Sequence, residues 1–151
     1  MSSDLIELLV AFVAARIRFL IIGGHAVIHY GEPRYTKDVD IWIEASKING
    51  AKVYKVLKVF GAPLQNLSVK DFSEPGSFFT MGNPPTRVDI IMSLKGLNFK
   101  SAWKKKVPGK VYGVVVPVID VQSLIVSKLS AGRPQDLMDA GILQRKLLLK
   151  L

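Results

Sequence analysis

The chain has 151 residues, of which 49% are hydrophobic and 22% charged, a composition typical of one folded domain and not of a disordered segment. It contains no cysteine, which excludes a disulfide framework, a thiolate zinc site and a cysteine nucleophile, so any metal must be bound by oxygen or imidazole ligands. The net charge of +9 favours an anionic partner such as a nucleotide, an RNA or an acidic surface.

The N-terminal segment is apolar but interrupted by charge. Apolar residues recur at helical spacing over residues 5–13, which predicts an amphipathic helix of about four turns. A continuous apolar run at Phe19–Ile22 predicts a short buried strand. Glu7, Arg16 and Arg18 break the apolar stretch, which argues against a signal peptide or a membrane-spanning helix. We therefore expect a cytoplasmic protein.

Glycines and polar loops divide the next part of the chain. Gly23-Gly24 ends the first strand, and residues 26–30 predict one or two turns of helix. After a loop, residues 39–43 predict a second strand. A second helix follows, with Ser46 or Asn49 as its cap, and ends at a glycine.

The second half predicts a hairpin, a basic helix and a further strand. Residues 77–81 and 87–92 are expected to be strands joined by a Gly-Asn-Pro-Pro turn. Residues 99–106 predict a short basic helix. Residues 111–119 predict one β-branched strand, in which Pro117 indicates an edge or a bulge.

Two helices close the chain. Asp120 is expected to cap a helix that runs through Leu129, and Pro134 to begin the last helix after a Gly-Arg break. No internal repeat or linker is visible. The sequence therefore predicts a single α/β (α+β) domain over residues 1–151, built on a small mixed β-sheet flanked by helices.

Two aspartates on the second strand are the first candidates for chemistry. Asp38 and Asp40 lie two residues apart, so their side chains share one face of the strand. Adjacent carboxylates repel each other unless a cation lies between them, and Mg²⁺ prefers such oxygen ligands. The alternative is two solvated aspartates at a strand end, and the Asp-x-Asp pattern alone does not decide between the two.

A third aspartate, Asp89, lies among apolar neighbours on a later strand, where an unpaired carboxylate is rare. If that strand lies beside the strand of Asp38 and Asp40, three carboxylates converge, as they do in sites that hold two metal ions for phosphoryl transfer. The alternative is a salt bridge from Asp89 to Arg87 or to another basic residue.

The order and spacing of these segments resemble a known signature. A strand ends in Gly23-Gly24, a spacer of thirteen residues (25–37) follows, and Asp38-Val39-Asp40-Ile41 comes next. This pattern is similar to that of the nucleotidyltransferase superfamily that includes DNA polymerase beta, with Asp89 at the position of the third aspartate. Residues 34–38 and 128–137 resemble minimal, stand-alone bacterial and archaeal nucleotidyltransferase-like proteins, some of which belong to toxin–antitoxin systems.

The resemblance implies a nucleotidyltransferase fold and the transfer of a nucleoside monophosphate from an NTP, such as ATP, to an acceptor hydroxyl, with release of pyrophosphate. It implies that Asp38, Asp40 and Asp89 are catalytic and bind Mg²⁺ or Mn²⁺. The acceptor is left open between an RNA end such as that of a tRNA, a protein side chain and a small molecule. A homodimer or a complex with a partner protein is also left open. The residues expected to contact the nucleotide are Gly23, Gly24, Arg34, Thr36 and Lys128.

Two other functions compete with this one. A non-catalytic module with the same fold could serve as a binding partner or an antitoxin, and a basic RNA-binding protein could use its acidic residues only for structure. The complete set of three carboxylates favours the enzyme, because an inactive relative would be free to lose carboxylates that cost stability.

Glycines at a strand-to-helix turn let a phosphate approach the backbone, although an ordinary tight turn also uses them.

Other polar groups are interpreted as structural. Three charged residues at the start of the last helix, Arg133, Asp136 and Asp139, predict an ion network. His25 and His29 are four residues apart, but no Glu follows the first histidine, so a packed pair near the nucleotide pocket is favoured over a zinc site. Lysines 104–106, with Lys100 and Lys110 nearby, form a basic patch around Trp103, which could bind RNA or another single strand, but a solvated face is favoured.

Overall fold

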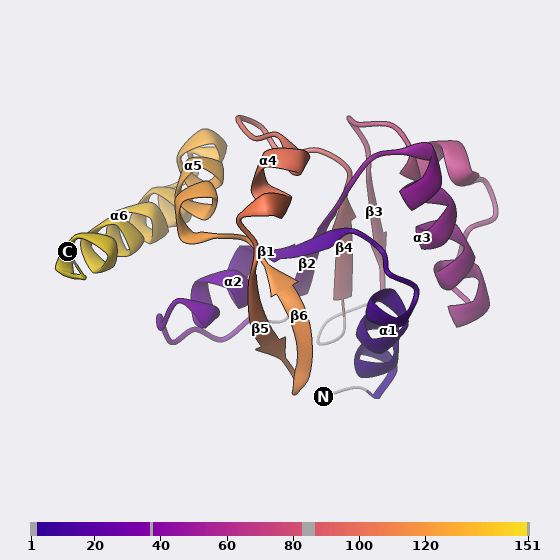
Figure 1. Ribbon diagram of the computed structural model, residues 1–151, viewed down its shortest axis with the longest axis horizontal. Coiled ribbons are helices and arrows are strands. Elements are labelled where there is room, and N and C mark those ends of the chain that lie inside the picture. Colours follow the sequence, from indigo (N-terminus) through magenta and orange to yellow (C-terminus); the bar gives the residue numbers. More distant parts are fainter. Residues whose placement is uncertain (1–2, 37, 83–86, 151) are drawn as a thin grey trace.

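The computed structural model describes residues 3–36, 38–82 and 87–150 (Figure 1). Within these residues the strands form one mixed sheet in the order β3-β4-β2-β1-β6-β5. In chain order the elements, including one 3-10 helix (η1), are α1 (Ser3–Ala14), β1 (Phe19–Ile22), α2 (Gly23–His29), β2 (Asp38–Ile43), α3 (Lys47–Phe60), η1 (Val69–Phe72), β3 (Phe78–Met81), β4 (Arg87–Ile91), α4 (Phe99–Lys104), β5 (Val107–Val111), β6 (Val114–Val118), α5 (Val121–Ala131) and α6 (Pro134–Leu149).

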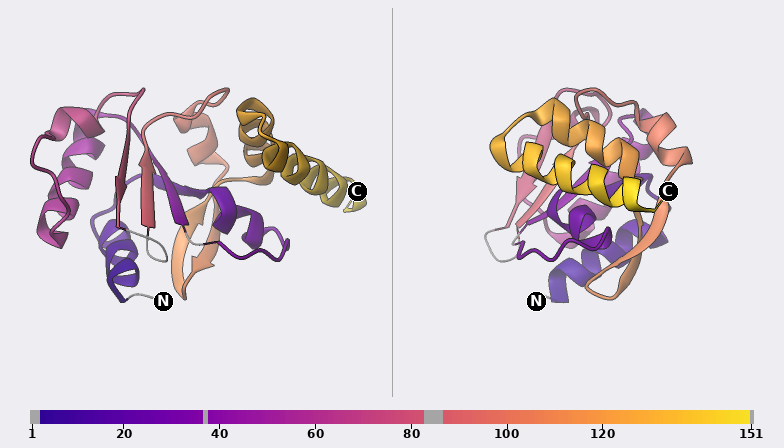
Figure 2. Two further views of the ribbon diagram at one scale, coloured as in Figure 1. Left: turned by 180° about the vertical axis from the view of Figure 1, so that it is seen from behind. Right: turned by 90° about the vertical axis from the view of Figure 1, so that its left-hand side faces the viewer.

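The helices cover the sheet from different sides. In Figure 1, α3 and η1 lie at one end of the molecule, and α5 and α6 lie at the other. The second view in Figure 2 shows α5 and α6 side by side, forming a helical hairpin that ends at the C-terminus. No helix in the described part of the chain is both long enough and apolar enough to cross a membrane.

The apolar stripe of α1 packs into the core, as its helical spacing predicts. Leu8, Leu9 and Phe12 are fully buried, and the Phe12 ring meets the edge of Phe19 on β1 at 5.4 Å. Burial of each such side chain contributes about 1.5–3 kcal/mol. The helix stops at Ala14, and Arg16 follows with a φ of 56°, so the predicted fourth turn does not form.

The cap of α3 is Ser46, one of the two predicted residues. Its Oγ accepts a hydrogen bond from the backbone N–H of Asn49 at 3.2 Å. Asn49 is instead a buried bridge: its amide side chain donates to the carbonyl oxygens of Arg18 and Glu44 and accepts from the Arg18 N–H. Gly61 ends the helix with a φ of 92°, a left-handed conformation that glycine tolerates best.

The prediction of one strand over residues 111–119 is wrong. The chain forms two strands, β5 and β6, joined by a tight turn in which Tyr112 and Gly113 have φ values of 50° and 83°. Such paired positive φ values match the right-handed twist of a hairpin. The predicted basic helix therefore ends at Lys104, and residues 107–111 belong to β5.

Pro117 is not on an edge strand, because β6 lies between β1 and β5. It faces Pro108 across the hairpin, and β6 pairs with β1 only where Val118 meets Ile21. A proline without an N–H donor is tolerated there because that stretch of β6 has no ladder to β1. The predicted hairpin of β3 and β4 forms as an antiparallel pair, while residues 83–85 of its expected turn lie outside the described residues.

Candidate active site

The register of two parallel strands brings the three aspartates together. Strands β2 and β4 are neighbours in the middle of the sheet, with Asp40 opposite Asp89 and Asp38 opposite Arg87. Side chains two residues apart on a strand, and directly opposite on its neighbour, share one face of the sheet. Asp38, Asp40 and Asp89 therefore project from the same face, as their convergence requires.

These carboxylates line a cavity of about 400 Å³ that also contains cations. The sheet contributes the three aspartates and Arg87 to the cavity wall, and the helical hairpin of α5 and α6 contributes Lys128 and Arg133. The full lining is Ile22, Gly23, Asp38, Asp40, Arg87, Asp89, Ile91, Leu94, Ser127, Lys128, Ala131, Arg133 and Asp136. A larger cavity of about 700 Å³ lies between α1 and α3, but none of these residues line it.

Gly23 lets a carboxylate lie against the backbone. Its φ is 66°, and a Cβ added at this position would lie 2.1 Å from Oδ2 of Asp40. A Cβ at Gly24 would lie 2.9 Å from Oγ1 of Thr36. Any side chain at Gly23 would therefore displace the carboxylate of Asp40 from the cavity. Gly23 thus makes room for Asp40, in addition to the predicted room for a phosphate.

The carboxylate of Asp40 is electrostatically unfavourable in this site. Its burial, followed by the charges of Asp89 and Asp38, raises its pKa well above the ordinary value, while Lys128 acts in the opposite direction. Asp40 and Asp89 lie close enough for their carboxyl groups to share a hydrogen bond. A cation placed between them would remove this repulsion, and hard divalent ions prefer carboxylate oxygens.

Asp89 has protein partners of its own. Its Oδ1 accepts hydrogen bonds from Oγ1 of Thr80 at 2.8 Å and from Nε of Arg87 at 3.1 Å. The predicted alternative, an ion pair between Asp89 and Arg87, is thus present together with the convergence of carboxylates. Thr80 lies opposite Asp89 in the β3–β4 register, so sequence spacing alone could not identify it.

The donor set fits a divalent cation in its chemistry. Asp38, Asp40 and Asp89 offer carboxylate oxygens from one face, and the raised pKa of Asp40 marks a deficit of positive charge. Within residues 3–36, 38–82 and 87–150, however, no three His, Asp or Glu side chains already stand in the arrangement of a metal shell.

A second carboxylate cluster lies beside the cavity, at the start of α6. Asp139 is fully buried and accepts hydrogen bonds from both terminal nitrogens of Arg34, one of them at 2.9 Å. Nζ of Lys128 lies 3.0 Å from Asp139 and 3.5 Å from Asp136, and Nε of Arg133 donates to Asp136 at 2.6 Å. This is the ion network that the sequence indicates, extended by Arg34 and Lys128.

The network strongly favours the ionised form of Asp139. Burial alone would raise the pKa of this carboxyl, but hydrogen bonds from Arg34, Lys128 and Gln135 outweigh burial and lower the pKa to about 2. Burial would also raise the pKa of Asp136, but the hydrogen bonds and charge of Arg133, together with the charge of Lys128, outweigh it and lower the pKa. Lys128 thus belongs to two sites: it neutralises the network and lines the cavity of the three aspartates.

The five residues expected to contact nucleotide divide into two groups. Gly23 and Lys128 line the cavity with the aspartates. Gly24, Arg34 and Thr36 are not among its lining residues. Arg34 is paired with Asp139, and Oγ1 of Thr36 donates to the carbonyl of Asp38 at 3.2 Å, so these two side chains support the loop that leads into β2.

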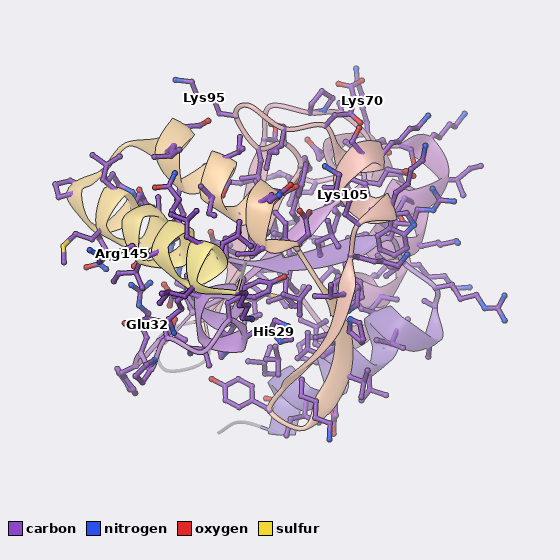
Figure 3. The ribbon with its side chains drawn as sticks, turned by 60° about the vertical axis from the view of Figure 1, so that its left-hand side comes forward. His29, Glu32, Lys70, Lys95, Lys105 and Arg145 are labelled. Atoms are coloured by element: carbon purple, nitrogen blue, oxygen red, sulfur yellow. The ribbon has the colours of Figure 1, made fainter. Side chains whose placement is uncertain are left out.

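The two histidines pack against different aromatic rings. His25 meets the edge of Tyr112 at 5.2 Å, and His29 meets Tyr30 at 4.8 Å. Burial lowers the pKa of His25. His29, labelled in Figure 3, lies against β5, since a Cβ at Gly109 would be 2.7 Å from its Nδ1. Each histidine is thus packed against an aromatic ring, and neither is among the residues that line the cavity of the three aspartates.

The lysine run lies at the end of α4, and its three residues are exposed. Trp103 stacks on Phe99 with ring centroids 5.8 Å apart. Nζ of Lys106 lies 4.1 Å from the Trp103 ring centroid, and the guanidinium of Arg18 lies 5.9 Å from it. The indole is thus already in contact with an aromatic ring and two cations of its own chain.

Comparison with known proteins identifies the fold. No protein-family model matches the sequence, and no curated protein matches it. Among solved structures, the chain is similar to the lincosamide antibiotic adenylyltransferase LnuA in its lincomycin-bound crystal structure, with a TM-score of 0.57 over 95% of this chain and 96% of that one. The chain has a nucleotidyltransferase fold. The sequence identity is 16%, so the likeness extends to the fold alone, and the resemblance to the minimal stand-alone proteins stays a prediction.

Proposed function

We propose that the protein is a divalent-metal-dependent nucleotidyltransferase, which transfers a nucleoside monophosphate from an NTP such as ATP to an acceptor hydroxyl. The observation that carries the proposal is the cavity in which Asp38, Asp40 and Asp89 face Lys128 and Arg133. A carboxylate wall suits metal ions, and a cationic wall suits a triphosphate. The nucleotidyltransferase fold shared with an adenylyltransferase supports the same reaction class.

The chain's residues have separate roles in this proposal. Asp38 and Asp40 would hold Mg²⁺ or Mn²⁺, and Gly23 leaves room for Asp40 to do so. Lys128 and Arg133 would contact phosphate oxygens from the opposite wall. A bound divalent cation would supply neutralisation of the triphosphate charge in the transition state. Gly24, Arg34 and Thr36 would act indirectly, through the loop that precedes Asp38.

Asp89 is proposed to accept the acceptor's proton. As the acceptor oxygen forms a bond to the α-phosphorus, the bond from that phosphorus to the oxygen of pyrophosphate breaks and the electron pair leaves with pyrophosphate. The hydroxyl proton passes to Asp89, whose Oδ1 is oriented by Thr80. Arg87 would pair with the ionised carboxylate of Asp89 before the transfer.

One observation favours a second candidate, a binding module without catalysis. Arg87 and Thr80 both donate hydrogen bonds to Oδ1 of Asp89. The guanidinium of Arg87 could therefore neutralise this carboxylate in place of a metal ion, and Asp89 would then serve only the structure. In that case the protein would bind a nucleotide or a partner protein through Lys128 and Arg133 but would transfer nothing.

The test is transfer from each α-³²P-labelled NTP in the presence of Mg²⁺ or Mn²⁺, with the protein itself, total tRNA and a panel of small hydroxyl compounds as acceptors. The proposal predicts label in one acceptor pool, stoichiometric pyrophosphate, and loss of both in Asp40→Asn. Metal-dependent nucleotide binding without label in any pool would favour the binding module.

A further inference from the structure

A second cavity adjoins the catalytic one along strands β3 and β4. It has a volume of about 320 Å³ and shares Arg87, Asp89 and Ile91 with the cavity of the three aspartates. The rest of its lining comes from β3, the segment before it and the end of β4, namely Gly76, Ser77, Phe78 and Ser93. Asp89 therefore stands at the boundary between two compartments.

The register of β3 and β4 places an aromatic ring on the same face of the sheet as Asp89. Phe78 pairs with Ile91, and Thr80 pairs with Asp89, so the ring of Phe78 shares a face with the third carboxylate. Phe79, which points to the opposite face, is buried, whereas Phe78 is 72% exposed. A single exposed phenylalanine is common, but this one lines a cavity that opens onto Asp89.

Hydrogen bonds connect the two chain segments that form the wall of the second cavity around Phe78. The backbone N–H of Gly76 donates to Oγ of Ser93 at 3.1 Å, and the N–H of Met92 donates to the carbonyl of Ser77 at 3.3 Å. These bonds link the segment before β3 to the end of β4. The second cavity is thus formed by the fold itself and does not depend on a bound molecule.

Fewer charged residues line the second cavity than the first. Arg87 is the cation among its lining residues, and it is already paired with Asp89. A polynucleotide acceptor would need further cations to follow its phosphates. A ring such as Phe78 instead suits a flat or apolar body without a chain of negative charges.

We propose that this second cavity is the acceptor subsite, and that it takes a hydroxyl carried on a compact aromatic or apolar body, with Phe78 as the residue that selects it. The inference rests on the proposed function, because Asp89 at the boundary would take the proton of that hydroxyl. The transferred group stays in the first cavity, where Lys128 and Arg133 lie. The new bond then forms between the acceptor oxygen and the α-phosphorus, as pyrophosphate leaves.

The experiment is an NMR titration of the full chain, with ¹³C-labelled phenylalanine, loaded with Mg²⁺ and a non-hydrolysable ATP analogue. The probes are benzyl alcohol and N-acetyl-tyrosinamide, with the oligoribonucleotide CCA as competitor. The proposal predicts saturable shifts of the Phe78 signal with at least one aromatic probe, no displacement by CCA, and at least about tenfold weaker probe binding in Phe78→Ala.

Tyr35→Ala is the matched control, because Tyr35 is another exposed aromatic, at 78%, and lies outside both cavities. It should leave probe binding unchanged, and Phe78→Ala should leave the affinity for the ATP analogue unchanged. Unmoved Phe78 signals with both probes, or displacement by CCA, in protein that binds the ATP analogue would overturn the acceptor subsite alone. Failure to bind the ATP analogue would overturn the proposed function and this inference together.

Discussion

Two clusters of carboxylates, one buried and one half-buried, lie side by side in this protein, and their charges are neutralised to different extents. At the start of α6, Asp139 is surrounded by Arg34, Lys128 and Gln135, which lower its pKa to about 2. On β2 and β4, Asp40 is surrounded by other carboxylates, and its pKa is raised. The first cluster is complete within the chain, whereas in the second Arg87 pairs with Asp89 but the repulsion at Asp40 remains. Incomplete neutralisation of this kind is typical of sites whose missing charge comes with a ligand.

Lys128, together with Arg133 and Asp136, joins the two clusters. Lys128 is 8% exposed and lies within 3.0 Å of Asp139, yet it also lines the cavity of the three aspartates. The completed cluster thus positions a cation at the edge of the incomplete one. This explains why a structural ion network lies directly beside the candidate active site.

The largest expected effect is on turnover in Asp89→Asn, which keeps the shape of the incomplete cluster and removes one charge. The variant should lose at least about a thousandfold in transfer, or roughly 4 kcal/mol of transition-state stabilisation, with ATP affinity within about tenfold of wild type. Single-turnover transfer and equilibrium ATP binding measure the two quantities. Undiminished transfer would show that Asp89 is structural.

An Asp-to-Asn substitution in the complete cluster should lower the free energy of unfolding. Asp139→Asn leaves the half-buried guanidinium of Arg34 without its carboxylate and the buried Lys128 with Asp136 alone, and should destabilise the protein by about 3 kcal/mol. Urea unfolding of wild type and variant at neutral pH gives this difference. A change below 1 kcal/mol would mean that solvent already screens these charges.

Acid should weaken the completed cluster in a defined range. The folded-state pKa of Asp139, about 2, lies below its ordinary value, so its contribution is fully present above about pH 4 and is lost as the pH falls toward 2. The loss should be about 2 kcal/mol. The stability difference between wild type and Asp139→Asn should therefore shrink between pH 5 and pH 2.5, and a constant difference would contradict the assignment.

The smallest expected effect is an increase in stability. In the absence of metal, Asp40→Asn removes one of the mutually repelling charges on β2 and β4 and should stabilise the fold by about 1 kcal/mol. Thermal unfolding in EDTA tests this prediction, with Glu74→Gln, an exposed acidic residue, as the control. Destabilisation of the metal-free protein by Asp40→Asn would mean that Asp40 is already neutralised within the chain.

Local patterns predicted the elements that carry the candidate site, but long-range pairing was invisible to them. The apolar run of β1 and the cap of the helix at Asp120 follow from neighbouring residues, and both form. The β5–β6 hairpin was missed because valines on both sides hide a turn at Tyr112, a residue that rarely takes a positive φ.

The roles of individual side chains depend on contacts that span the chain. Arg34, a predicted nucleotide contact, pairs with Asp139, 105 positions away in the sequence. The neighbouring placement of β2 and β4 cannot be read from either strand, since both are short apolar segments that could pair elsewhere. Only that register shows that Asp40 and Asp89 face each other.

The central claim is that the incomplete carboxylate cluster binds a metal–nucleotide complex. Isothermal titration of the full chain with Mn²⁺ and a non-hydrolysable ATP analogue tests it most directly, in wild type, Asp40→Asn and the Glu74→Gln control. The account predicts saturable, metal-dependent binding to wild type and to the control, and its loss in Asp40→Asn. Equal binding to wild type and Asp40→Asn, or no binding to either, would contradict it.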